Sequence, residues 1–175
     1  MKERFHYPLP RDEVKSIQQA IQKIRFAKEE YLYVFKGGKQ ILRFIGDESQ
    51  VNIPEQYLFQ LPDTVVVHNH PNNVSFSFED IDMALFHNIS KLIVSTPDFI
   101  YEVHRSGKSW DINFEKTDTL NFFYACQSIA RAELEKLIAQ NQMTPKELEL
   151  KLFHYIWLFF FNKFSIQYVQ KKHPK

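Results

Sequence analysis

A run of β-branched residues that ends in two histidines constrains this chain more than any other segment. Residues 64–67 are Thr-Val-Val-Val, and prolines bound the segment on both sides. β-Branched residues favour strands, so we predict a short buried strand over residues 64–70. Residues two apart on a strand share a face, so His68 and His70 lean together while Asn69 points away. Two such imidazoles can share one divalent metal ion, Zn²⁺ above all.

A carboxylate follows at the start of a predicted helix. Apolar residues recur at helical spacing from Ile81 onward and Ser77 is a typical N-cap, so the pattern predicts a helix over residues 78–88. Asp80 then lies in the first turn. A short polar loop can bring this carboxylate back to the two histidines as a third metal ligand. Three protein ligands leave a fourth tetrahedral position for water, as in catalytic zinc sites.

Simpler interpretations exist for each part. Ser77 and Asp80 also match a capping box, which needs no metal. Two histidines at this spacing are common as surface or hydrogen-bonded network residues. The succession of a β-branched strand, His-x-His-Pro, a polar loop and Ser-x-x-Asp favours the metal site.

This succession resembles the metal motif of the JAMM (MPN-plus) zinc metalloproteases, which include deubiquitinating isopeptidases and RadC-type bacterial proteins. The spacer between His70 and Ser77 is six residues, one shorter than in the best-known members, and the local sequence resembles a bacterial and phage-associated branch. The resemblance covers about residues 12–110. It implies a cytidine-deaminase-like fold, Zn²⁺ held by His68, His70 and Asp80, and a protein substrate, for which a ubiquitin-like protein is one candidate.

The family also carries a glutamate beside an earlier strand. Glu29 and Glu30 precede the aromatic and β-branched residues 31–35, which predict a strand, and a Gly-Gly turn predicts a hairpin with residues 40–45. The two glutamates face opposite sides, so only one can reach the metal. We favour Glu30, because it directly abuts the strand, with Glu29 as the alternative. Either could instead be an ordinary solvated charge.

The resemblance implies hydrolysis of an amide or isopeptide bond by a metal-activated water. The catalytic glutamate would accept the water proton and pass it to the leaving amine. Ser77 would donate a hydrogen bond to the developing oxyanion or orient the water.

The charge balance argues against a polyanion-binding surface. The chain has 22 basic and 21 acidic residues, a net charge of +1. Its N-terminus lacks the apolar region of a signal peptide, and no apolar stretch is long enough to cross a membrane. The single cysteine, Cys126, cannot form an internal disulfide. We therefore expect a cytoplasmic protein without membrane or nucleic-acid partners.

The order of predicted elements indicates an α/β protein, a mixed sheet flanked by helices, with two parts. Residues 1–112 form the metal-binding catalytic domain, and residues 113–175 form a C-terminal helical hairpin extension. The remaining predicted elements are a helix over 12–26, a brief strand over 51–53, a helical turn over 54–60, strands over 91–95 and 99–104, helices over 117–140 and 145–170, and a frayed basic tail over 171–175.

The middle of the helix over residues 145–170 is apolar nearly all round, with a run of aromatic residues over 153–161. Such a helix is either buried or forms a contact surface for a second copy or another protein. Three functions therefore stay open: a zinc hydrolase, a metal-retaining but non-proteolytic scaffold module of the phage-related kind, and a RadC-type nucleic-acid-associated protein. Near-neutral charge disfavours the last.

Overall fold

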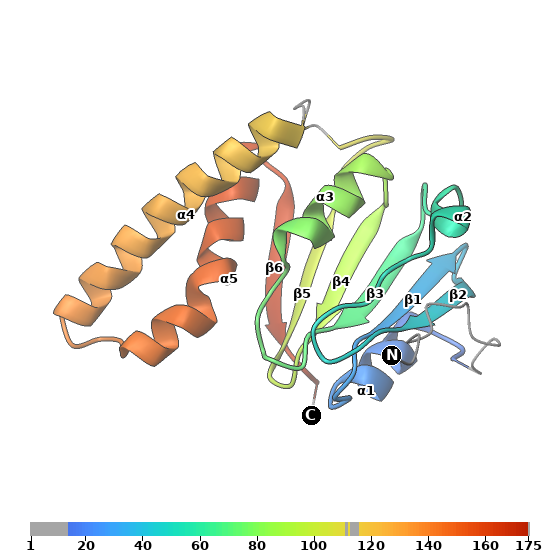
Figure 1. Cartoon of the computed structure of the whole chain (residues 1–175), viewed down its shortest axis with the longest axis horizontal. Coiled ribbons are helices and arrows are strands. Elements are labelled where there is room, and N and C mark those ends of the chain that lie inside the picture. The colour runs from blue at the N-terminus through green and yellow to red at the C-terminus, as the bar shows by residue number, and fades with distance from the viewer. Residues whose placement is uncertain (1–13, 111, 113–115, 175) are drawn as a thin grey trace, which may run out of the picture.

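The computed structural model describes residues 14–110, 112 and 116–174. Within them, six strands form one mixed sheet in the order β2-β1-β3-β4-β5-β6 (Figure 1). The strands are β1 (Tyr31–Lys36), β2 (Lys39–Ile45), β3 (Val65–Asn69), β4 (Lys91–Ser95), β5 (Phe99–His104) and β6 (Gln167–Lys172). The predicted mixed sheet flanked by helices is thereby confirmed.

Helices cover both faces of the sheet. They are α1 (Ile17–Ile24), α2 (Glu55–Leu58), α3 (Phe78–Phe86), α4 (Lys116–Ala139) and α5 (Pro145–Lys163). Helix α1 packs on one face, against β1 and β3, and α3 lies on the other (Figure 1). Helices α4 and α5 form an antiparallel hairpin beside β6, and this hairpin extends away from the sheet. None of the helices in the described part of the chain is both long and apolar enough to cross a membrane.

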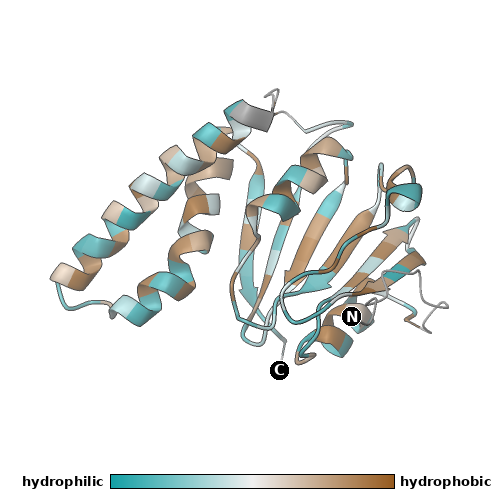
Figure 2. Ribbon diagram, viewed as in Figure 1, coloured by the Kyte–Doolittle hydropathy of each residue, from teal (hydrophilic) through white to brown (hydrophobic). Residues whose placement is uncertain are grey.

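The alternation of strand residues sorts side chains into two cores. Leu32 and Val66 join the core beneath α3, α4 and α5, whereas Tyr33 and Val67 join the core beneath α1. Apolar residues accordingly dominate the central strands (Figure 2). The same alternation places the side chain at position 68 on the α3 face of the sheet.

The connection between β3 and β4 brings the end of a strand beside the start of a helix. These two strands are parallel, with Asn69 opposite Ser95, whereas every other pair of neighbouring strands in the described sheet is antiparallel. A parallel pair needs a crossover, and α3 supplies it. The loop after β3 must therefore pass the strand's carboxyl end before α3 begins at Phe78, which brings these two segments together.

Most predicted elements are confirmed to within a few residues at their ends, and three predictions are wrong. Residues 51–53 form no strand. The helix predicted over 145–170 ends at Lys163. Of the predicted frayed tail over 171–175, Lys171 and Lys172 belong to strand β6, which pairs with β5, and Lys175 lies outside the described residues. Ser165 has a positive φ of 54°, so the chain turns there and leaves the helix. The unpaired edge of β5 then accepts residues 167–172, a partner that no local pattern reveals. The first residues of the helix predicted over 12–26 lie outside the described residues.

Candidate metal centre

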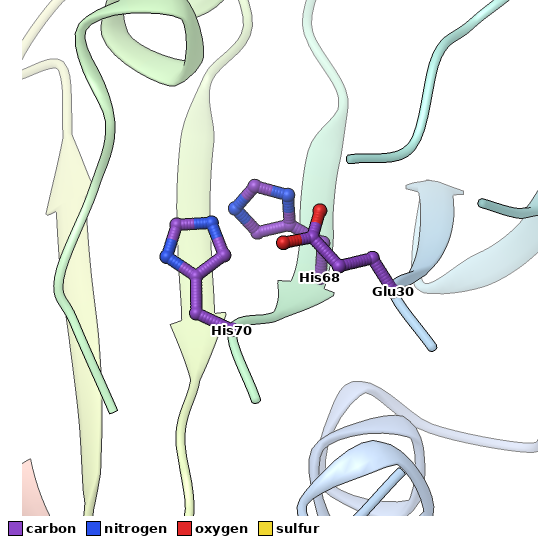
Figure 3. Close-up of side chains that lie close together, drawn as sticks. All are labelled: Glu30, His68 and His70. Carbon is purple, nitrogen blue, oxygen red and sulfur yellow. The ribbon is translucent and has the colours of Figure 1, made fainter. Parts of the chain in front are cut away.

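The two histidines lie side by side at the carboxyl end of β3. His68 is the penultimate residue of the strand and His70 directly follows it; both are buried, with 2% and 8% of their surface exposed. Their ring centroids are 4.8 Å apart. Figure 3 shows both rings on one side of the strand, with the carboxylate of Glu30 approaching them from the segment before β1.

Asp80 faces both imidazoles from the first turn of α3. Its Oδ1 lies 3.5 Å from Nε2 of His68, and its Oδ2 lies 3.3 Å from Nε2 of His70. The capping box is present as well: Asp80 N–H donates to Ser77 Oγ at 3.1 Å, and Ser77 N–H donates to Asp80 Oδ2 at 2.7 Å. The capping and metal-site interpretations therefore describe the same geometry, because the cap holds the carboxylate where it faces the histidines.

The hydrogen bonds of His70 leave its Nε2 directed at the site. Its Nδ1 is 2.9 Å from the carbonyl oxygen of Ser75 and 3.1 Å from that of Val74, so Nδ1 carries a proton and donates it. A backbone carbonyl of this kind commonly orients a metal-binding histidine. In His68, Nε2 is buried and makes no hydrogen bond within the described residues. A buried nitrogen without a hydrogen bond is rare in folded proteins, and a cation would satisfy it.

Glu30 completes the cluster, and Glu29 does not. Ligand atoms of Glu30, His68 and His70 all lie within 4.8 Å of one another. Glu30 is 7% exposed, whereas Glu29 is on the surface. The sequence favoured Glu30, with Glu29 as the alternative, and the structure brings Glu30 to the histidines.

The buried setting shifts the pKa of each titratable group in the cluster. Burial raises the pKa of Glu30 to about 7; His70 opposes the rise, whereas Asp80 and Asp47 add to it. Burial lowers the pKa of His68 to about 4, which keeps that ring neutral and its nitrogen lone pair available.

His70 and Asp80 behave as a coupled pair. Burial alone would lower the pKa of His70, but attraction and hydrogen bonding to Asp80 raise it to about 9. Burial likewise opposes ionisation of Asp80, yet the two histidines and the Ser77 N–H hold its pKa well below the usual range. The cluster therefore favours a positive charge next to the Asp80 carboxylate, and a metal cation meets that requirement.

These residues line a cleft of about 480 Å³. Its lining includes Glu30, both histidines, Ser77 and Asp80, which come from three separate segments. Further lining residues come from the loop after β2, from the loop after β3, from α3 and from α5: Ser49, Gln50, Val51, Asn52, Asn72, Val74, Ser75, Glu79 and Phe153.

The loop after β2 needs glycine at position 46. A Cβ on Gly46 would lie 1.8 Å from the carbonyl oxygen of Gln50, so only glycine fits there. The loop is closed further by Asp47, whose Oδ1 accepts hydrogen bonds from the N–H groups of Ser49 and Gln50. This tight loop forms the polar wall of the cleft.

Sequence reasoning missed this loop and the contribution of α5, because neither carries a recognisable motif. It also treated Asn69 only as a residue that points away from the metal. The position of Asn69 between the two histidines was the only feature of the sequence that could have drawn attention to it.

No protein-family model, curated protein or solved structure matches this chain. What the fold and the cluster define is a mixed α/β protein with a candidate divalent-metal centre at the carboxyl end of β3.

Proposed function

We propose that this chain is a zinc-dependent metallohydrolase of the JAMM type that cleaves an amide or isopeptide bond in a protein substrate. One observation carries the proposal. Glu30, His68 and His70 converge within 4.8 Å at a cleft, and Asp80 faces both imidazoles from the next helix.

The donor set suits zinc. Imidazole nitrogen and carboxylate oxygen are ordinary zinc ligands, and two histidines with one carboxylate leave a coordination position open. His68 has a buried nitrogen without a hydrogen bond among the described residues, and His70 is oriented by backbone carbonyls. We assign His68, His70 and Asp80 as the ligands that would hold the ion. The three-layer arrangement supports the cytidine-deaminase-like fold that the motif implies.

The chain's own residues supply the remaining chemistry. When bound, zinc makes water nucleophilic near neutral pH and polarises a carbonyl group. Glu30, with a pKa of about 7, is matched to accepting a proton and returning it to a leaving amine. Ser77 Oγ accepts the Asp80 N–H, so its hydroxyl proton can be donated to a carbonyl oxygen in the cleft.

Metal analysis and a hydrolysis assay test the proposal together. Purified protein reconstituted with zinc should hold about one ion per chain, and His70→Ala should lose most of it. Hydrolysis of ubiquitin-like fusion proteins and peptide amides should be abolished in Glu30→Gln, with about one zinc ion per chain still bound at saturating zinc. The matched control is Glu29→Gln, because Glu29 is its exposed neighbour. Unchanged zinc content in His70→Ala would refute the ligand assignment.

A metal-retaining scaffold module is the second candidate. The α4–α5 hairpin extends away from the sheet and exposes Tyr124, Ile129, Leu150 and Leu158. Trp157, Phe160 and Phe161 are buried, so most of the aromatic run in α5 serves packing. The scaffold alternative predicts zinc binding without hydrolysis of any fusion or peptide, and an assembly that is lost when the exposed hairpin residues become charged.

A further inference from the structure

We propose that Asn69 is the positioning residue for Glu30: its side chain clamps the backbone on both sides of that carboxylate. The inference rests on the proposed function, because it assigns Asn69 a role at the same metal centre. Asn69 lies between the two histidines in sequence, yet its side chain lies on the opposite, α1 face of the sheet.

The clamp consists of two hydrogen bonds from one buried amide. Asn69 Oδ1 accepts the backbone N–H of Tyr31 at 2.8 Å, and Asn69 Nδ2 donates to the backbone carbonyl of Glu29 at 3.0 Å. The two bonded groups flank Glu30 in the chain. Asn69 is 1% exposed, so water cannot replace either bond without opening the sheet.

The strand register explains why a side chain is needed there. Strands β1 and β3 pair antiparallel from Phe35 opposite Val65 to Leu32 opposite His68. One residue further, the Tyr31 N–H bonds to the side chain of Asn69. The backbone of Asn69 is paired on its other side with β4. The side chain therefore extends the β1–β3 connection past the end of the backbone pairing.

Glu30 is also held from the β2 side. Its N–H donates to the carbonyl of Asp47 at 2.6 Å, and its carbonyl accepts the N–H of Gly46 at 2.8 Å. With the neighbouring peptide groups bonded to Asn69, the backbone around Glu30 is restrained from two directions. The carboxylate can then reach the histidines by side-chain rotation alone.

Asparagine suits this position because its amide offers a donor and an acceptor side by side. Aspartate lacks the donor to the Glu29 carbonyl, and serine is too short to reach both peptide groups. The tripeptide 68–70 thus supplies two proposed metal ligands, His68 and His70, on one face of the sheet. On the other face it supplies Asn69, which holds the backbone of the proposed base, Glu30. A shift of β3 would move His68, Asn69 and His70 together, and Asn69 would carry the backbone of Glu30 with it. The distance from Glu30 to the histidines is therefore preserved.

A double-mutant cycle with Co²⁺ as the probe tests this role. Co²⁺ affinity and the visible absorption of the bound ion would be measured for wild type, Asn69→Ala, Glu30→Gln and the double variant. Residues that orient a metal site typically contribute on the order of 10-fold to metal affinity, so Glu30→Gln should weaken binding by about that factor. Asn69→Ala should weaken it measurably but by no more than Glu30→Gln does, with an absorption change like that of Glu30→Gln. The double variant should bind no more weakly than Glu30→Gln alone.

Ser95→Ala is the matched control. Ser95 lies opposite Asn69 in β4, is fully buried, and bonds through its hydroxyl to the Ile21 carbonyl. It should lower the unfolding midpoint without changing the Co²⁺ affinity or absorption. If Asn69→Ala does not fold, Asn69→Ser takes its place in the cycle, because a serine side chain cannot make both bonds.

Three results would overturn the inference alone: wild-type Co²⁺ binding in Asn69→Ala, losses that add in the double variant, or a Glu30→Gln variant indistinguishable from wild type. Additive losses would mean that Asn69 acts on the metal centre by another route. A wild-type chain that binds no Co²⁺ would remove the proposed function, and this inference with it.

Discussion

Trp157 in α5 donates its indole N–H to the backbone carbonyl oxygen of Phe76 over 2.7 Å, across 81 residues of sequence. Phe76 lies between Ser75, whose carbonyl orients His70, and Ser77, which caps α3 and holds Asp80. The side chains of Trp157 and Phe76 are both fully buried. The C-terminal helix therefore fixes the backbone of the loop that sets two of the three proposed metal ligands.

Replacing Trp157 with phenylalanine should weaken both folding and metal binding. The ring is retained, but the buried Phe76 carbonyl loses its donor, which costs about 1–3 kcal/mol of unfolding free energy. Zinc affinity should fall as well, because the loop between His70 and Asp80 loses its anchor. Denaturant unfolding and competition with a chelator would measure the two effects.

Trp110→Phe provides the comparison. Trp110 donates its indole N–H to the carbonyl oxygen of Ala84, a buried residue of α3, at 3.0 Å. It should cost less stability, because the Ala84 carbonyl keeps the N–H of Ile89 as a donor at 3.0 Å, and it should leave zinc affinity unchanged. Equal zinc affinity in Trp157→Phe and Trp110→Phe would show that the contact to Phe76 supports only the fold.

Zinc should stabilise the folded chain by mass action. Zinc at about 100 times its dissociation constant adds about 2.7 kcal/mol to the unfolding free energy when the unfolded chain does not bind it. Thermal unfolding in zinc and in chelator would show this difference as a shift in midpoint. His68→Ala should remove the shift, because the ligand set is then incomplete. A thermal-unfolding midpoint of the wild-type chain that is the same in zinc and in chelator would contradict the metal assignment.

Ser77→Ala should reduce both stability and rate. Loss of an N-cap hydroxyl typically costs about 1 kcal/mol. If the same hydroxyl stabilises an oxyanion, hydrolysis should slow by on the order of 10²-fold. Thr144→Ala separates the two effects, since Thr144 caps α5 with the same capping-box geometry. That variant should lose comparable stability and keep the wild-type rate; equal rate losses in both would remove the catalytic role of Ser77.

Glu102 should make the attachment of β6 dependent on pH. This residue of β5 pairs with Lys91 of β4 at 2.7 Å and with Lys171 of β6. Burial by itself raises the pKa of Glu102, but hydrogen bonds from Lys171 and Lys91 outweigh it and lower the pKa below the ordinary value. A carboxyl group with a lowered folded-state pKa contributes stability above its unfolded pKa, and that contribution is lost as the pH falls through the folded value.

Glu102→Gln should therefore lower the unfolding free energy at neutral pH by roughly 1 kcal/mol, a modest figure because the lysines are partly exposed. The difference from wild type should disappear in acid, below the pKa of Glu102. Unfolding free energies measured from neutral to acidic pH would check this. A difference that does not change with pH would mean that the ion pairs contribute nothing to the attachment of β6.

Local patterns in the sequence were enough to predict where His68, His70 and Asp80, the proposed metal ligands, lie. The β-branched run predicts the strand, its alternation sets His68 and His70 on one face, and the Ser77 cap puts Asp80 in the first turn of α3. Each of these features depends on residues within a few positions of one another, which is why periodicity and capping chemistry reveal them.

Only the tertiary structure decided what surrounds those donors. Glu30 rather than Glu29 lies beside the histidines, and Asn69 of β3 bonds the peptide groups on both sides of it. Strand β6 forms because β5 offers an open edge. Trp157 meets Phe76 from the far end of the chain. These contacts join segments tens of residues apart, and their partners follow from how the whole chain packs, so no window of neighbouring residues contains them.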